Sequence, residues 1–129
     1  MIGVPKMSKT ILIADDEKNI LISLEFLMKR EGYRVEVAHD GQEAIDAISK
    51  EHPDLVLLDV MMPKKTGFDV CQEVRANPDL KDTLILMLTA KGRDTDIAKG
   101  LALGANGYVI KPFSTRELAQ KVRDMLDQA

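Results

Sequence analysis

Short apolar runs alternate along the chain with stretches in which apolar residues recur at helical spacing. Four of the runs lie at residues 11–14, 55–58, 84–88 and 108–110, and the segment 33–37 alternates apolar with polar residues. Continuous apolar runs are typical of strands that are covered on both faces, whereas alternation is typical of a half-exposed strand. The pattern therefore predicts five strands, with 33–37 at an edge of the sheet.

The segments between these strands have the periodicity of helices that bury one face. Ile20, Leu24 and Leu27 lie on one side of the first segment, and Gly32 ends it. The other predicted inner faces are Ala44, Ile45 and Ile48; Phe68, Cys71 and Val74; Ile97, Ala98 and Leu101; and Leu118, Val122 and Leu126.

Polar residues mark the predicted starts of three of these helices. Asp40 with Glu43, and Ser114 with Glu117, resemble capping boxes, in which two residues satisfy each other's backbone N–H groups. Asp94 is predicted to cap the fourth helix.

Five strands that alternate with five helices predict a parallel α/β sheet with helices on both faces and right-handed connections. The edge strand favours the order 2-1-3-4-5, a doubly wound flavodoxin-like fold, and five units are too few for an eight-fold barrel. We expect residues 9–129 to form one domain and residues 1–8 to be a disordered leader.

Composition narrows the class of protein. The chain has 129 residues, of which 45% are hydrophobic and 30% charged, as in ordinary globular domains. A net charge of -3 argues against direct nucleic-acid binding by a basic face. A single cysteine, Cys71, allows no internal disulfide and favours a cytoplasmic location. No apolar run approaches the ~18 residues of a membrane span, so we expect no membrane contact.

Candidate chemistry lies where the predicted strands end. In open parallel sheets, ligands bind at the carboxyl ends of the strands, beside the point where the strand order reverses. Asp15 and Asp16 follow the first strand, and Asp59, Thr89 and Lys111 follow the third, fourth and fifth. Each is also a plausible polar strand end or loop cap when taken alone. Together they bring three carboxylates, a hydroxyl and an ammonium to one rim.

This set of groups suits phosphoryl transfer onto an aspartate. Clustered carboxylates repel one another unless a cation joins them, and an all-oxygen site shared with phosphate oxygens suits Mg²⁺. One carboxylate can then act as a nucleophile on phosphorus, while the lysine and the hydroxyl stabilise the developing charge.

Four segments around these residues resemble the signature segments of the response-regulator receiver family of two-component signalling. They are IADDE at 13–17, LLDVMMP at 57–63, LTA at 88–90 and YVIKPF at 108–113. All four in this order are highly specific, and the resemblance runs from about residue 9 to the end of the chain. It is closest in kind to chemotaxis and phosphorelay receivers.

The resemblance implies a metal site and a phosphoacceptor. Asp59 would accept a phosphoryl group from a sensor histidine kinase or a histidine phosphotransfer protein. Asp16, Asp59 and the backbone carbonyl of Met61 would bind Mg²⁺ directly, and Asp15 would bind it through water. Met61 and Lys91 would stand at the two positions that tune the lifetime of the phosphoryl group. Because the apolar side chain of Met61 cannot orient an attacking water, we expect slow self-dephosphorylation.

The resemblance also implies a switch. Thr89 would hydrogen-bond the phosphoryl group, Lys111 would form an ion pair with it, and the peptide bond to Pro112 would be cis. Tyr108 would turn inward as Thr89 moves. The face formed by the fourth helix, the last strand and the last helix would then change its affinity for an output domain, a downstream protein or a second copy. Its charged residues are Arg93, Asp96, Lys99, Arg116, Lys121, Arg123 and Asp124.

Two other classes of function stay open at this stage. One is an enzyme that forms an aspartyl phosphate on the way to processing external substrates, although the chain has no room for a substrate-binding insert. The other is an interaction domain that works without phosphorylation, against which the presence of all five site residues argues. We expect a phosphoacceptor rather than an enzyme. Whether the receiver stands alone or belongs to a longer regulator is left open.

Overall fold

The computed structural model describes residues 9–128, in which strands and helices alternate as expected. In chain order the elements are β1 (Thr10–Ala14), α1 (Lys18–Arg30), β2 (Arg34–Ala38), α2 (Gly41–Glu51), β3 (Leu55–Asp59), α3 (Gly67–Ala76), β4 (Leu84–Ala90), α4 (Asp94–Ala102), β5 (Gly107–Lys111) and α5 (Thr115–Gln128). The predicted leader, residues 1–8, lies outside the described residues, so the domain boundary at residue 9 stays a prediction.

The strands form one parallel sheet in the order β2-β1-β3-β4-β5, which confirms the predicted topology. All residues of β3 are buried at the centre of the sheet, whereas β2 alternates exposed and half-buried residues before a buried Ala38 at its end. The strand order reverses between β1 and β3. The carboxyl ends of these two strands are therefore where a ligand site is expected.

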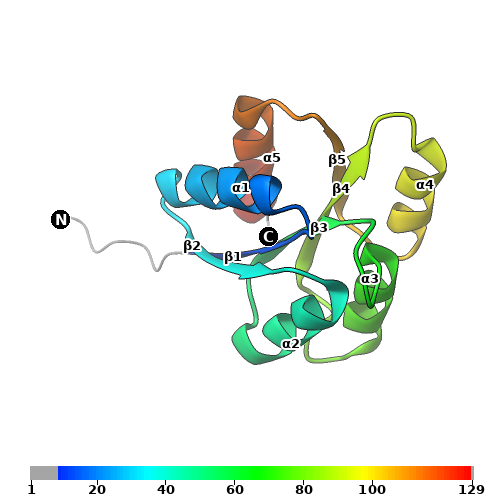
Figure 1. Ribbon diagram of the computed structural model, residues 1–129. Helices are drawn as coiled ribbons and strands as arrows, with labels where there is room; N and C mark the ends of the chain where they lie inside the picture. The colour runs from blue at the N-terminus through cyan, green and yellow to red at the C-terminus, as the bar shows by residue number, and fades with distance from the viewer. Residues whose placement is uncertain (1–8, 129) are drawn as a thin grey trace.

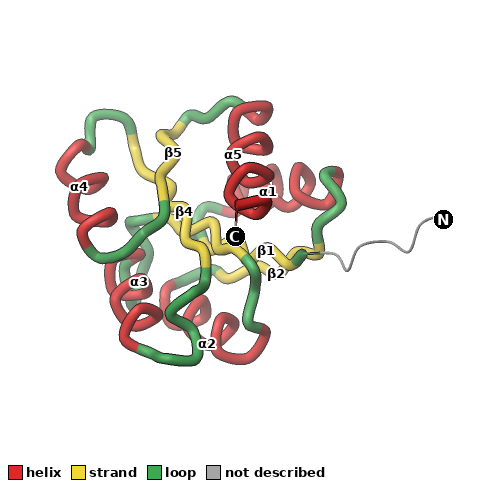
Figure 2. Tube along the Cα trace, turned by 180° about the vertical axis from the view of Figure 1, so that it is seen from behind, coloured by secondary structure: helices red, strands yellow, loops and turns green. Residues whose placement is uncertain are grey.

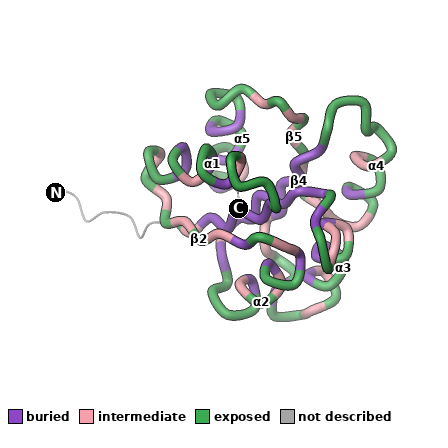
Figure 3. Tube along the Cα trace, in the orientation of Figure 1, coloured by how far each residue is buried: buried purple, intermediate pink, exposed green. Residues whose placement is uncertain are grey.

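Two layers of helices cover the sheet. In Figure 1 and from behind in Figure 2, α1 and α5 lie on one face, and α2, α3 and α4 lie on the other. Leu24 and Leu118 belong to the core cluster of the first face, and Ile48 and Val74 belong to that of the second. Figure 3 shows the buried residues following the strands through the middle of the molecule. Because both faces are covered, polar chemistry is confined to the rim of the sheet.

Each of the two predicted capping boxes forms only one of its two hydrogen bonds. Asp40 Oδ1 accepts a hydrogen bond from the Glu43 N–H at 2.8 Å, but the Glu43 carboxylate lies 2.9 Å from His39 Nδ1 instead of returning to residue 40. At α5, Ser114 Oγ accepts from the Glu117 N–H at 3.3 Å. Each box thus supplies a side-chain cap for its helix without the reciprocal bond.

The predicted cap at Asp94 is wrong. Helix α4 begins at Asp94 itself, and the preceding residue, Arg93, occupies the capping position without a side-chain capping bond. A complete box is present instead at α3: Thr66 Oγ1 accepts from the Asp69 N–H at 3.2 Å, and Asp69 Oδ2 accepts from the Thr66 N–H at 3.0 Å. Sequence analysis missed it because Asp69 replaces the usual Glu or Gln.

A close backbone approach positions the end of β3. The Gly67 N–H donates to the Val60 carbonyl at 2.8 Å, so α3 starts directly against the residues that follow the strand. A Cβ atom at Gly67 would overlap the carbonyl oxygen of Asp59. Glycine is therefore required at this position for Asp59 and α3 to keep their places.

We expect Gly67→Ala to lower the free energy of unfolding by about 2–4 kcal/mol, because the new methyl group must displace backbone atoms. Urea denaturation measures the change. Gly100→Ala is the matched control, since its Cβ would lie 3.4 Å from Met87 Cγ in ordinary contact. It should keep or gain stability, by up to ~1 kcal/mol from helix propensity. Equal losses in the two variants would contradict this account of Gly67.

Candidate functional site

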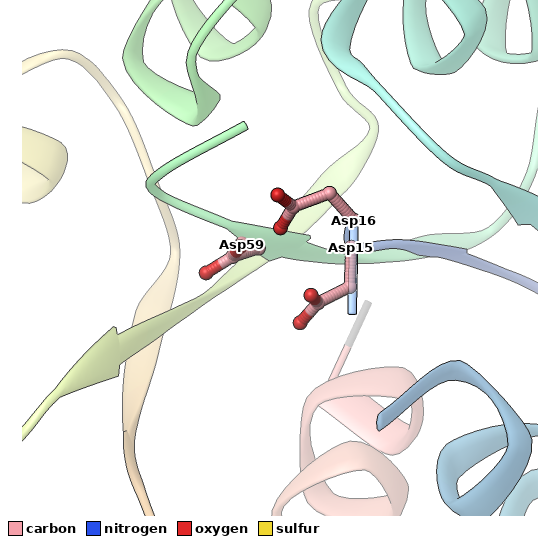
Figure 4. Close-up of side chains that lie close together, drawn as sticks. All are labelled: Asp15, Asp16 and Asp59. Carbon is pink, nitrogen blue, oxygen red and sulfur yellow. The ribbon is translucent and has the colours of Figure 1, made fainter. Parts of the chain in front are cut away.

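Three carboxylates meet at the carboxyl ends of β1 and β3. Asp15 and Asp16 directly follow β1, Asp59 ends β3, and one ligand oxygen from each lies within 4.8 Å of the others. Figure 4 shows the three side chains close together and pointing to the same side of the strand ends. Asp15 and Asp59 are buried, whereas Asp16 is exposed. The structure therefore assembles the predicted acidic cluster.

Lys111, the last residue of β5, joins two of these acids. Its Nζ lies 3.0 Å from Asp15 Oδ2, 3.2 Å from Asp59 Oδ1 and 3.4 Å from Glu17 Oε1. Burial alone would lower the pKa of Lys111, but the hydrogen bond to Asp15 and the charges of Asp59 and Asp15 outweigh burial and raise it. Lys111 therefore stays charged, and the expected cis peptide bond to Pro112 follows it.

Asp15 uses both of its oxygens within the protein. Oδ1 accepts from the Glu17 N–H at 2.9 Å, and Oδ2 accepts from Lys111. Asp16, in contrast, makes no hydrogen bond to another described residue. The two adjacent aspartates therefore differ: Asp15 organises the loop after β1, and Asp16 has free oxygens for a ligand.

The environment of Asp59 disfavours its charged form. Burial and the negative charge of Asp15 raise its pKa from 3.8 to about 6, although the charge and hydrogen bond of Lys111 act in the opposite direction. A divalent cation at the cluster would reverse this balance, because an added positive charge favours the carboxylate. The all-oxygen donor set and the excess of negative charge fit such an ion.

Thr89 contributes a buried hydroxyl without a partner. Its side chain is 2% exposed, and Oγ1 has no hydrogen-bond partner in the described part of the chain. Leaving a buried hydroxyl unsatisfied costs about 1–3 kcal/mol, so such groups are rare without a reason. Thr89 lines the same cavity as Asp59 and Lys111, so an oxygen of a ligand in the cavity could accept a hydrogen bond from the Thr89 hydroxyl.

The cavity has a volume of about 310 Å³. It is lined by Asp16, Glu17, Asp59, Val60, Met61, Leu88, Thr89, Ala90, Arg93, Asp96 and Lys111. Arg93 and Asp96 were expected on a partner-facing surface, and their place in this lining was not predicted. Their polar character indicates only that they avoid the core, and no local signal shows that the turn after β4 brings them to the cavity that Asp59 also lines.

Tyr108 lies apart from this cavity. Its side chain is 36% exposed, and Lys121 Nζ lies 5.4 Å from the centre of its ring. The tyrosine lines a second cavity, of about 560 Å³, along β5 and α5. In this conformation the structure does not bring Tyr108 together with Thr89.

Comparison with known proteins identifies the family. A model of the response regulator receiver domain matches residues 11–123. The chain belongs to the response regulator receiver domain family. It is therefore placed among phosphoacceptor domains rather than enzymes, with a receiver's acidic pocket and lysine.

Solved structures of receivers resemble this one over nearly their whole length. A protein described as a response regulator from Chloroflexus aurantiacus is 38% identical with a TM-score of 0.90, covering 93% of this chain and 98% of that one. Chemotaxis protein CheY4 of Vibrio cholerae is 34% identical, with a TM-score of 0.85 over 91% of this chain and 98% of that one. The receiver domain of a Syntrophus aciditrophicus signal transduction histidine kinase is 30% identical, with a TM-score of 0.88 over 95% and 92%.

None of the helices between residues 9 and 128 has the length and hydrophobicity that a membrane crossing requires.

Asp59 makes the stability of the metal-free receiver depend on pH. Because its pKa is raised, the folded protein binds this proton more tightly than the unfolded chain does, and wild-type stability falls as pH rises from 3.8 to about 6. Asp59→Asn removes that loss. We expect the variant to exceed wild type by about 1–3 kcal/mol at neutral pH, in urea denaturation with a chelator.

The same comparison near pH 3.8 is the internal control, because residue 59 is then uncharged in the folded state of both proteins. The advantage of Asp59→Asn should shrink there. An advantage that is the same at both pH values would show that the variant acts through packing rather than charge.

The Thr89 hydroxyl, which has no partner in the described part of the chain, predicts an unusual result for Thr89→Val. The variant keeps the shape of the side chain and removes the buried hydroxyl, so we expect its free energy of unfolding to equal or exceed that of wild type, by up to ~1–2 kcal/mol. Thr89→Ala, which leaves a void, is the control and should be less stable than wild type. A loss in Thr89→Val as large as in Thr89→Ala would show that the hydroxyl is satisfied.

Proposed function

We propose that this receiver accepts a phosphoryl group on Asp59 from a sensor histidine kinase or a histidine phosphotransfer protein. The observation that carries the proposal is the setting of Asp59. Its carboxylate forms an ion pair with Lys111 and lines a cavity that is also lined by Thr89, whose hydroxyl has no partner among residues 9–128. Family membership supports the class of donor.

The proposed reaction is a direct displacement at phosphorus. An oxygen of Asp59 forms the new bond to phosphorus while the bond between phosphorus and the donor's imidazole nitrogen breaks, and the imidazole leaves with the bonding electrons. Lys111 contacts only Oδ1, which leaves Oδ2 without a partner among the described residues. The Lys111 ammonium and the Thr89 hydroxyl are then placed to stabilise charge on the phosphoryl oxygens.

We propose Mg²⁺ as the cation of this site. Asp16, Asp59 and the backbone carbonyl of Met61 would bind it directly, and Asp15 would bind it through water. The free oxygens of Asp16 and the occupied oxygens of Asp15 support this division. When bound, the ion neutralises charge on the phosphoryl group during transfer.

The proposed output is a change in the face formed by α4, β5 and α5. The hydroxyl of Thr89 would move to the phosphoryl group, and Tyr108, now exposed, would turn into the space left behind. A histidine kinase and an output domain, a downstream protein or a second receiver would be the partners, in the cytoplasm. The second cavity beside Tyr108 and Lys121 gives this face room to reshape.

Incubation with acetyl phosphate and Mg²⁺ tests the phosphoacceptor. We expect intact-mass spectrometry to show the addition of one phosphoryl group to wild type and none to Asp59→Asn or to wild type with a chelator. Asp79→Asn, which removes an exposed acid outside the cavity, should be modified like wild type. With apolar Met61 at the cavity, the modification should outlast seconds. Equal modification of Asp59→Asn would overturn the proposal.

A further inference from the structure

A second cation, Arg93, lines the Asp59 cavity beside Lys111. Lys111 ends β5 and Arg93 lies in the turn after the neighbouring strand β4: Ala90, at the end of β4, is in register with Lys111, and the Arg93 N–H donates to the Ala90 carbonyl at 3.3 Å. This turn after β4 brings the arginine side chain to the wall of the cavity.

Within residues 9–128, one acid, Asp96, is bonded to the side chain of Arg93. Its Nε lies 2.8 Å from Asp96 Oδ2, and the Asp96 N–H also donates to the Arg93 carbonyl at 3.0 Å. The Asp96 carboxylate is only 13% exposed, whereas the arginine side chain is 50% exposed. A guanidinium has five N–H donors, and the donors on the two terminal nitrogens of Arg93 make no hydrogen bond to the described residues.

The lining of the cavity has more acidic than basic side chains, which is unfavourable for binding an anion. Its lining carries the acids Asp16, Glu17, Asp59 and Asp96 against the two cations Lys111 and Arg93. Lys111 is already shared among three carboxylates. An arriving phosphoryl group carries more than one negative charge, so the excess of acids in the lining repels it. Arg93 is the cation of the lining whose terminal N–H donors make no hydrogen bond to the described residues.

We propose that Arg93 is a recognition residue for the phosphoryl group and that Asp96 restrains it in the unphosphorylated receiver. The terminal nitrogens of Arg93 bind oxygens of the incoming phosphoryl group, a geometry that a guanidinium suits and an ammonium does not. Asp96 competes for the same side chain. This proposal rests on Asp59 as phosphoacceptor and adds a residue that its family resemblance did not assign.

The two residues should therefore have opposite effects on the rate of phosphorylation. With acetyl phosphate below saturation and Mg²⁺ in excess, we expect Arg93→Gln to be about 3- to 10-fold slower than wild type. Arg93→Lys should lie between them, because it keeps a charge but loses the planar pair of donors. Asp96→Asn should be faster by about 2- to 5-fold, since it releases the arginine. Intact-mass time courses give the rate constants.

Matched controls separate this effect from general charge and from folding. Asp94→Asn removes an acid from the same turn of α4 but not from the cavity lining, and Arg116→Gln removes an arginine from α5 outside it. Both should react like wild type. Raising the ionic strength should narrow the gap between wild type and Arg93→Gln, because salt screens the charge. Urea denaturation confirms that each variant is folded.

The rates of the Arg93 and Asp96 variants decide whether the proposal holds. Opposite signs for Arg93→Gln and Asp96→Asn, with unchanged controls, support the proposal. An unchanged rate in Arg93→Gln overturns the proposal. A slowing in Asp96→Asn as large as that in Arg93→Gln also overturns it, because the pair would then serve only to stabilise the first turn of α4. Failure of wild type itself to be modified would instead overturn Asp59 as acceptor, and with it any role for Arg93.

Discussion

The contact of the Lys111 ammonium with buried carboxylates is the interaction on which the site depends. Asp15 follows β1 and Asp59 ends the neighbouring β3; both are buried, so water screens their repulsion poorly. Lys111 reaches both from β5 at the edge of the sheet. The ion pairs therefore connect the acidic cluster at the centre of the sheet to β5, the strand that also carries Tyr108.

The unphosphorylated receiver is incompletely satisfied at this rim. Burial and Asp15 hold the pKa of Asp59 at about 6, and the Thr89 hydroxyl has no partner in the described structure. Functional sites often retain locally unfavourable interactions of this kind, and the stability of the rest of the fold offsets them. Here a cation would relieve the repulsion and a phosphoryl oxygen would satisfy the hydroxyl. The proposed Arg93–Asp96 pair shares this property, since the terminal nitrogens of Arg93 also have N–H donors without partners among the described residues.

Most of the fold, and the position of the five candidate site residues at the rim of the sheet, could be predicted from the sequence, because the signals are local. Apolar runs and periodicity define strands and helices, the alternating segment marks an edge, and the residues after each run must lie at the rim. The misassigned cap at Asp94 shows the limit of such signals. The backbone of Arg93, rather than a side-chain acceptor, determines where α4 begins.

The parallel sheet, its strand order and the position of Asp59, Asp16 and Lys111 on one rim thus follow from the order of apolar and polar residues, because the carboxyl ends of parallel strands lie at the same edge of a sheet. Three features appear only once the chain is folded: the carboxylate oxygens that Lys111 binds, the lack of a partner for the Thr89 hydroxyl among residues 9–128, and the position of Arg93 in the cavity lining. Those facts depend on the path of loops and on the spacing of side chains from different strands. No pattern along the chain encodes such distances, because they arise only when separate elements pack together.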